Sequence, residues 1–301
     1  MLSCYNQSSR YSVNIPSTIS LIYTIFSSCY SENGGGIDIH NSDVVLRVEF
    51  SGFANCGCAL RGGAIFVRDC KEIKLKNVCF DSCYSLTDSP SFQLASWGFN
   101  LLSTDINMST ESNPREGKYP SGAGGRNRFA YYYNNVTDLF MRERGSGNYF
   151  VNSPAGLVSS FCQFSGFVAR NQFMIQNPSI IIFSHMNFLN YTQSTEGFVR
   201  ISGVSSKTVF ENSVFLIGSC PKMIFNEGTL SGSLDFNNCY FSITFTSSIF
   251  TACTLNSCYF PHHSTINIVV PNTYYCWCNI DPTQPKTLMR SGLFIQLIFW
   301  V

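Results

Sequence analysis

The chain contains few charged residues. Only 12% of its 301 residues are Asp, Glu, Lys or Arg, which is about half the share found in an ordinary globular domain. The two signs nearly balance, and a net charge of +1 provides no long-range field to steer nucleic acid or an anionic membrane towards the protein. Hydrophobic residues make up 45% of the chain, too many for intrinsic disorder. We therefore expect a folded protein without a nucleic-acid partner.

The sequence also lacks an apolar run long enough to cross a bilayer, which needs about 20 residues. Residues 19–26 (ISLIYTIF) are rich in β-formers and are expected to form a buried strand rather than the core of a signal peptide. Residues 1–17 are then an N-terminal cap or leader. The apolar decamer 292–301 implies a membrane partner only if it is the first half of a truncated anchor, and it is otherwise a terminal strand or cap.

No stretch of ten or more residues shows the 3.6-residue apolar period of a helix, and a repeat of short β-rich segments is present instead. The glycine-led segments GGI at Gly35 and GGAI at Gly62 differ by one inserted residue, and alternating segments lie between them at 44–50 and 73–80. A Phe-x-x-Cys motif recurs every 27 residues, at Phe26/Cys29, Phe53/Cys56 and Phe80/Cys83.

Further along the chain the repeat is looser. Segments ending in Phe recur at steps of 24, 27 and 26 residues, at Phe164, Phe188, Phe215 and Phe241. A period of this length, built from short strands and glycine turns, predicts coils of about 24–30 residues that stack strand on strand, because one coil cannot bury its inward face alone. Like residues then form ladders along the stack.

The domain boundaries follow from this pattern. We predict one all-β solenoid, a single-stranded parallel β-helix, over residues 18–278, followed by a C-terminal tail at 279–301. The Gly-, Pro- and Ser-rich stretch 103–128 is predicted to be a long loop excursion from one coil. Near Pro261 the coil spacing shortens, which favours a capping turn.

The GGAI element, the Phe-x-x-Cys steps and the N-x-x-F-like strand ends resemble right-handed parallel β-helix proteins of the pectin-lyase-like type. More closely, the chain resembles the polymorphic-outer-membrane-protein-like surface proteins of some parasitic protists. The resemblance covers about residues 26–278, with its specific motifs mostly in 26–83. It implies a right-handed β-helix on the cell surface or secreted, used in adhesion, without established chemistry.

The 14 cysteines allow two interpretations. In an oxidising compartment several would be paired, whereas in a reducing one they would serve as small buried hydrophobes. Four Asn-x-Ser/Thr sequons, at Asn6, Asn107, Asn135 and Asn190, are compatible with a secretory route. Stacking would align Cys29, Cys56 and Cys83 in a ladder. Three stacked cysteines make at most one bond, so we expect a buried ladder of free thiols there.

Catalytic motifs of β-helix enzymes are missing. The chain has no Asp-Asp pair and no Gly-His-Gly group, which are typical of galacturonate hydrolysis by paired carboxylates. The nearest candidates for a calcium-dependent lyase are Asp38, His40 and Asp43, which fit an ordinary turn between strands equally well. We assign no catalytic residue.

Other candidate sites are weighed in the same way. Soft metal ligands cluster near the C-terminus, at Cys253, Cys258, His262, His263, Cys276 and Cys278. Their cysteine spacings differ from the Cys-x₂-Cys pairs of structural zinc sites, so we assign no metal and no cofactor. Basic residues that could bind an anion are interspersed with glutamates, which favours a solvated loop; they are Arg115, Lys118, Arg126, Arg128, Arg142 and Arg144. The run Tyr131 to Tyr133 is attributed to packing rather than to carbohydrate stacking.

The sequence thus predicts a non-catalytic surface or secreted protein in adhesion or recognition, with a host-surface protein or glycan as partner. Two alternatives stay open. One is a polysaccharide lyase or glycoside hydrolase-like β-helix enzyme, and the other is a degenerate, truncated paralogue.

Overall fold

The structure is a computed structural model of the whole chain. The described residues are 11–13, 17–40, 43–87, 91–95, 103–107, 110–112, 122–124, 128–132, 135–137, 146–151, 157–160, 162–165, 168–169, 171–176, 180–193, 197–202, 207–219, 221–227, 233–243 and 246–260.

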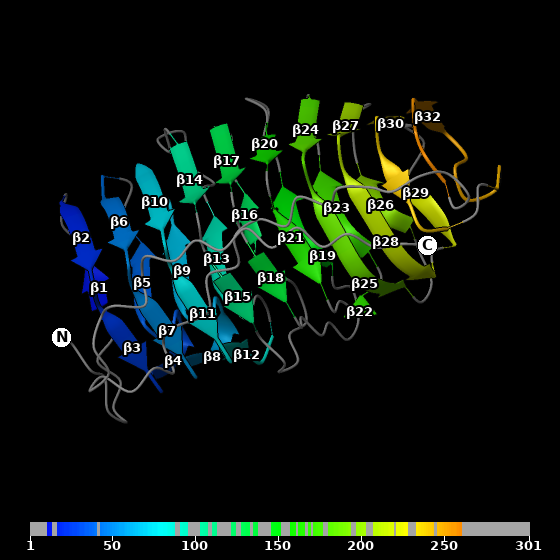
Figure 1. Cartoon of the computed structure of the whole chain (residues 1–301). Helices are drawn as coiled ribbons and strands as arrows, with labels where there is room; N and C mark the ends of the chain where they lie inside the picture. Colours follow the sequence, from blue (N-terminus) through cyan, green and yellow to red (C-terminus); the bar gives the residue numbers. More distant parts are fainter. Residues whose placement is uncertain are drawn as a thin grey trace, which may run out of the picture.

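In these residues the chain is an all-β solenoid, and every strand pairs in parallel with the strands of neighbouring coils. Three long sheets run the length of the molecule, and each coil adds one strand to each of them in turn. Figure 1 shows the resulting elongated stack, with β1–β3 at one end and β29–β32 at the other. The predicted fold class is confirmed.

The strands of each sheet are given in their hydrogen-bonded order. Sheet A consists of β1 (Tyr11–Val13), β5 (Ile37–His40), β9 (Ile65–Arg68), β13 (Phe92–Ala95), β16 (Gly122–Gly124), β19 (Ser146–Val151), β23 (Asn171–Gln176), β26 (Gly197–Ser202) and β29 (Lys222–Glu227). Sheet B consists of β2 (Thr18–Ile22), β6 (Val45–Glu49), β10 (Glu72–Lys76), β14 (Ser103–Asn107), β17 (Arg128–Tyr132), β20 (Leu157–Ser160), β24 (Ile180–Ser184), β27 (Lys207–Glu211), β30 (Ser233–Asn237) and β32 (Cys253–Asn256).

Sheet C consists of β3 (Ile25–Ser27), β7 (Gly52–Ala54), β11 (Cys79–Asp81), β15 (Thr110–Ser112), β18 (Asn135–Thr137), β21 (Gln163–Ser165), β25 (Asn187–Gln193), β28 (Val214–Ser219) and β31 (Tyr240–Phe241), with β22 (Val168–Ala169) pairing beside it on β25. A short sheet D, made of β4 (Tyr30–Asn33), β8 (Gly57–Arg61) and β12 (Tyr84–Ser85), completes the first coils.

Strand register gives the length of each coil. Ile19 pairs with Leu46 and Leu46 with Ile73, so the first coils have the predicted 27 residues. The later steps vary, and two of them depart furthest from 27. Ile73 pairs with Thr104, 31 residues on, and Leu234 pairs with Cys253, 19 residues on. The shortening expected near Pro261 therefore lies slightly earlier, between β30 and β32.

The core is built from inward-facing residues that alternate with exposed ones, as a strand with one buried face requires. In β2 the buried residues are Ile19 and Leu21, and in β6 they are Leu46 and Val48. Next to them, in sheet C, lies the predicted phenylalanine ladder. The ring centroids of Phe26 and Phe53 are 4.8 Å apart and those of Phe53 and Phe80 are 5.3 Å apart, with nearly parallel planes.

Towards the C-terminal end the core contains two ladders. Phe188, Phe215 and Phe241 stack in sheet C at 4.9 and 4.8 Å. A second ladder stacks in sheet B, from Phe183 through Phe210 to Phe236, at 4.7 and 5.4 Å. The two ladders meet edge to face, an arrangement that aromatic rings favour. The repeat of strand ends in the sequence predicted only the sheet C ladder.

The prediction of a loop excursion at 103–128 is wrong. Three strands lie in this range, β14, β15 and β16, and they continue sheets B, C and A in register. The segments contain few large apolar residues, so their sequence pattern is weak, but backbone hydrogen bonds to the adjacent coils do not depend on side chains. The stack also begins before residue 18, because β1 pairs with β5.

The one-residue insertion between the two glycine segments is absorbed in sheet D. Ser31 pairs with Cys58 but Asn33 pairs with Arg61, so β8 bulges by one residue. The glycine that follows the strand in each coil, Gly34 or Gly62, has a positive φ and turns the chain into sheet A.

Candidate functional site

The turn from sheet B to sheet C is the most regular corner of the solenoid. In each coil whose corner is described, one residue adopts the left-handed conformation, with φ between 47° and 54°; these residues are Tyr23, Phe50, Asn77, His185, Asn212, Asn238 and Ser257. Its backbone amide donates to a carbonyl of the next coil, as from Tyr23 to Glu49 and from Phe50 to Lys76. The residue that follows the left-handed one points inward. Where this next residue is Ser51 or Ser213, its hydroxyl accepts a hydrogen bond from the backbone amide of the equivalent residue one coil earlier, Thr24 or Met186.

Aromatic side chains occupy this corner in the first two coils. Tyr23 and Phe50 stack with their ring centroids 5.3 Å apart and their planes inclined by 20°. Tyr23 is 61% exposed and its neighbour Ile22 is 51% exposed. We call these three residues, Ile22, Tyr23 and Phe50, the aromatic corner. The sequence motifs did not predict this corner, although Tyr23, Phe50 and Asn77 follow the same 27-residue step as the phenylalanine ladder.

The backbone of the aromatic corner is strained. A left-handed conformation costs a residue with a Cβ atom about 1 to 2 kcal/mol, and Asn tolerates it better than a bulky residue. Asn occupies the equivalent position as Asn77, Asn212 and Asn238. Neither ring is part of the buried core in exchange, since Tyr23 is exposed and Phe50 is only partly buried. Strain at an exposed position is a feature of functional sites.

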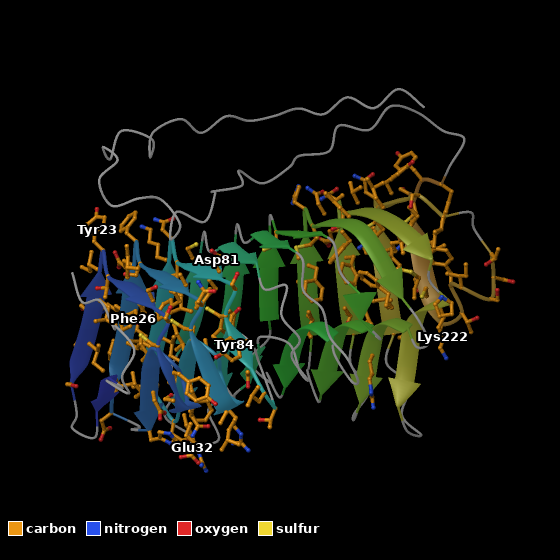
Figure 2. All side chains as sticks on the ribbon, turned by 90° about the horizontal axis from the view of Figure 1, so that it is seen from below. Tyr23, Phe26, Glu32, Asp81, Tyr84 and Lys222 are labelled. Atoms are coloured by element: carbon orange, nitrogen blue, oxygen red, sulfur yellow. The ribbon has the colours of Figure 1, made fainter. Side chains whose placement is uncertain are left out.

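Sheet D carries a second exposed apolar group. The ring of Tyr84 lies flat against the backbone of Gly57, where a Cβ atom would be 2.3 Å from the Tyr84 Cζ atom. Tyr30 lies in the strand on the other side of Gly57, and the centroids of the Tyr30 and Tyr84 rings are 6.4 Å apart. Leu60 and Leu86, in or next to the same short sheet, are exposed. In Figure 2 Tyr84 and Glu32 lie towards one side of the stack, and Tyr23 lies towards the other.

The candidate lyase residues are only partly brought together. Asp38 and His40 lie in β5, and the Asp38 Oδ1 and His40 Nε2 atoms are 2.8 Å apart. Asp38 is fully buried, and its register partners are Ser12 and Phe66, not a second acid. Asp43 lies apart from them, as an exposed residue in the turn before β6.

The predicted cysteine ladder is present. Cys29, Cys56 and Cys83 are buried thiols outside any disulfide bond, and they follow the left-handed residues Ser28, Asn55 and Ser82 at the corner between sheets C and D. Nine described cysteines are in the thiol form, namely these three and Cys58, Cys70, Cys162, Cys239, Cys253 and Cys258. Cys79 is disulfide-bonded. Burial raises the pKa of Cys70 to about 12, so its thiol is inert.

Several other candidates fall partly or wholly outside the described residues. Within the described part of the chain no cluster of three metal-ligating side chains is found. Cys253 lies in β32 and Cys258 two residues after that strand, whereas His262, His263, Cys276 and Cys278 are not described. Arg128, Tyr131 and Tyr132 form part of the backbone of β17, and the candidates Arg115, Lys118, Arg126, Tyr133, Arg142 and Arg144 are not described.

A search of the described residues for a helix long and apolar enough to cross a membrane finds none. The sequence matches no known protein-family profile, no curated protein and no solved structure.

Proposed function

We propose that this chain is a non-catalytic surface or secreted β-solenoid that binds a glycan or a protein on another cell through the aromatic corner. The observation that carries the proposal is the stacked Tyr23–Phe50 pair, in which Tyr23 is exposed and Phe50 is partly exposed. Both residues have a left-handed backbone that Asn adopts one coil later. Exposed aromatic side chains are the residues on which binding energy most often concentrates.

The resemblance to polymorphic-outer-membrane-protein-like surface proteins supports this proposal, since that family implies adhesion at a cell surface. The four sequons agree with passage through a secretory route. A rigid solenoid suits the role because side chains from successive coils keep a fixed spacing of about 4.8 Å along the stack.

The test replaces Tyr23 and Phe50 by Asn, the residue found at the equivalent position of the next coil, Asn77. The Tyr23→Asn/Phe50→Asn variant removes the aromatic corner and should leave the free energy of unfolding unchanged or higher, because Asn accepts a positive φ. We expect binding to a glycan array and to cultured cells to fall about tenfold or more, as for loss of a binding hot spot. Cells treated with glycosidase or protease distinguish a glycan partner from a protein partner.

Ser28→Asn is the matched control. Ser28 has a φ of 55° at the corner between sheets C and D, so this change introduces Asn into the same backbone conformation without removing a ring. The proposal is refuted if the double variant binds as well as the unmodified chain, or if the unmodified chain binds neither the array nor cells.

A second candidate function is a polysaccharide lyase or glycoside hydrolase, favoured by the Asp38–His40 pair. A carboxylate that orients an imidazole is a common part of general-base catalysis. Cleavage of acidic polysaccharides by the purified chain, lost on Asp38→Asn and kept in the aromatic-corner variant, would replace the adhesion proposal by this one.

A further inference from the structure

Two cysteines occupy the last described positions of the B–C corner. Cys239 follows the left-handed residue Asn238, and Cys258 follows the left-handed Ser257. The amide of Tyr259 donates to the Cys239 carbonyl at 2.8 Å, and Tyr240 and Tyr259 form a parallel bridge. Cys258 is therefore stacked directly on Cys239, one coil further along.

The side chains of both residues point into the stack. The Cys239 Sγ atom lies 3.4 Å from the carbonyl oxygen of Phe210, and the Cys258 Sγ atom lies 3.3 Å from that of Phe236. Neighbouring parallel strands place stacked Cα atoms about 4.8 Å apart, within the Cα–Cα range of about 4.4 to 6.8 Å that disulfides span.

The two thiols differ in exposure and acidity. Cys239 is completely buried, whereas Cys258 is only partly buried. The hydrogen bond with Cys239 lowers the pKa of Cys258 to about 7 and raises the pKa of Cys239. Cys258 is thus the more accessible and the more acidic of the two thiols, and Cys239 is the one held in the protonated form by its raised pKa.

We propose that Cys239 and Cys258 are a thiol oxidation site that closes to a disulfide bond by exchange with a small-molecule disulfide such as oxidised glutathione. The Cys258 thiolate attacks one sulfur of that disulfide, its S–S bond breaks, and one glutathione thiolate leaves. Cys239 then loses its proton to the released thiolate and attacks the Cys258 sulfur, which expels the second glutathione. The protein gives up two electrons and two glutathione molecules are formed.

The other stacked cysteines provide a contrast within the same chain. Cys29, Cys56 and Cys83 are also stacked one coil apart, but all three are buried. The hydrogen bond with Cys29 lowers the pKa of Cys56, but the hydrogen bond with Cys83 and burial outweigh it and raise that pKa well above its ordinary value. A small-molecule disulfide therefore reaches Cys258 and not this ladder.

The test is a titration of the full chain with mixtures of oxidised and reduced glutathione, followed by alkylation and peptide mapping. No Lys or Arg lies between Lys222 and Lys286, so digestion uses chymotrypsin, which cuts between the two cysteines. We expect a linked Cys239–Cys258 peptide, while Cys56 and Cys83 remain alkylated as thiols. The rate of the first step should rise with pH through about 7, because only the thiolate reacts.

Two variants separate the steps. Cys239→Ser should stop at a persistent glutathione adduct on Cys258, whereas Cys258→Ser should leave Cys239 unmodified. Cys253→Ser is the control, because Cys253 is also partly exposed but lies at the other end of β32, and it should not change the outcome. The proposal is overturned if Cys258 stays reduced throughout the titration or is linked to a cysteine other than Cys239.

Discussion

At the scale of single residues, the turns of this solenoid depend on a small set of left-handed positions. Most of these positions hold Asn, Ser or Asp, but Gly34 is different because it has no room for any side chain. A Cβ atom there would lie 1.9 Å from the carbonyl oxygen of Ile37 and 2.8 Å from the amide nitrogen of Phe66. Both neighbours are backbone atoms of strands that cannot move independently.

We therefore predict that Gly34→Ala lowers the free energy of unfolding by about 3 kcal/mol, through a strained φ and a backbone clash. Gly57→Ala is the matched comparison, because the three atoms nearest to its new Cβ atom all belong to the Tyr84 ring, which is partly exposed and can swing aside. Urea denaturation of both variants measures the difference. A loss for Gly57→Ala as large as that for Gly34→Ala would contradict the argument.

The pair Cys239 and Cys258 also belongs to this scale. The segments NNCYF, from residue 237, and NSCYF, from residue 256, are 19 residues apart, and this similarity was the available signal that both cysteines occupy the same corner. A repeat of 27 residues does not predict it, because this step is eight residues shorter. The aromatic corner was detectable in principle, but whether a ring at a given step points into or out of the stack depends on the backbone conformation of one residue.

At the scale of elements, the ladders are the main source of cohesion between coils. Phe210 lies at the centre of the C-terminal pair of ladders, stacked between Phe183 and Phe236 and in edge contact with Phe188 and Phe215. It is completely buried, so truncation leaves a cavity that neighbouring coils cannot fill without losing register.

Phe210→Ala is expected to destabilise the protein by about 4 kcal/mol, and Phe210→Leu by about 1 to 2 kcal/mol. Tyr259→Ala serves as the surface control, since Tyr259 is 45% exposed, with an expected change within about 0.5 kcal/mol. Denaturant unfolding followed by circular dichroism gives all three values. Equal losses for Phe210→Ala and Tyr259→Ala would show that the ladder does not hold the coils together.

The elements differ in how far the sequence predicted them. The repeat of Phe26, Phe53 and Phe80 predicted the first ladder, because three coils of equal length preserve both spacing and residue type. Strands β14 to β16 were missed because a strand inside a stack is stabilised by backbone bonds to coils on both sides and needs few apolar residues of its own. The repeat of segments that end in Phe did not predict the ladder of Phe183, Phe210 and Phe236, because these residues lie in the sheet B strands that precede the segment ends.

At the scale of the whole molecule, each of the described strands pairs with strands of the adjoining coils and with no more distant ones. Stability in such a stack is a sum of coil and interface terms, so damage at one coil spreads locally. Phe53 is buried in the N-terminal ladder, between Phe26 and Phe80.

We predict that Phe53→Ala speeds amide hydrogen exchange about tenfold or more in β3, β7 and β11, and less than about threefold in the distant strands β27 and β30. Hydrogen exchange followed by mass spectrometry resolves the two regions. A uniform increase over all of these strands would mean that the solenoid unfolds as one cooperative unit.

The in-register pairing of equivalent residues also determines how such a chain can change in length. Thr24 and Ser51, or Met186 and Ser213, lie 27 residues apart and occupy the same place in successive coils. Duplication of any whole coil therefore adds one rung to every sheet and every ladder without altering the contacts on either side. Gene segments of about this size can be gained or lost while the fold persists, and the aromatic corner and the cysteine pair can move apart or together as the stack grows or shrinks.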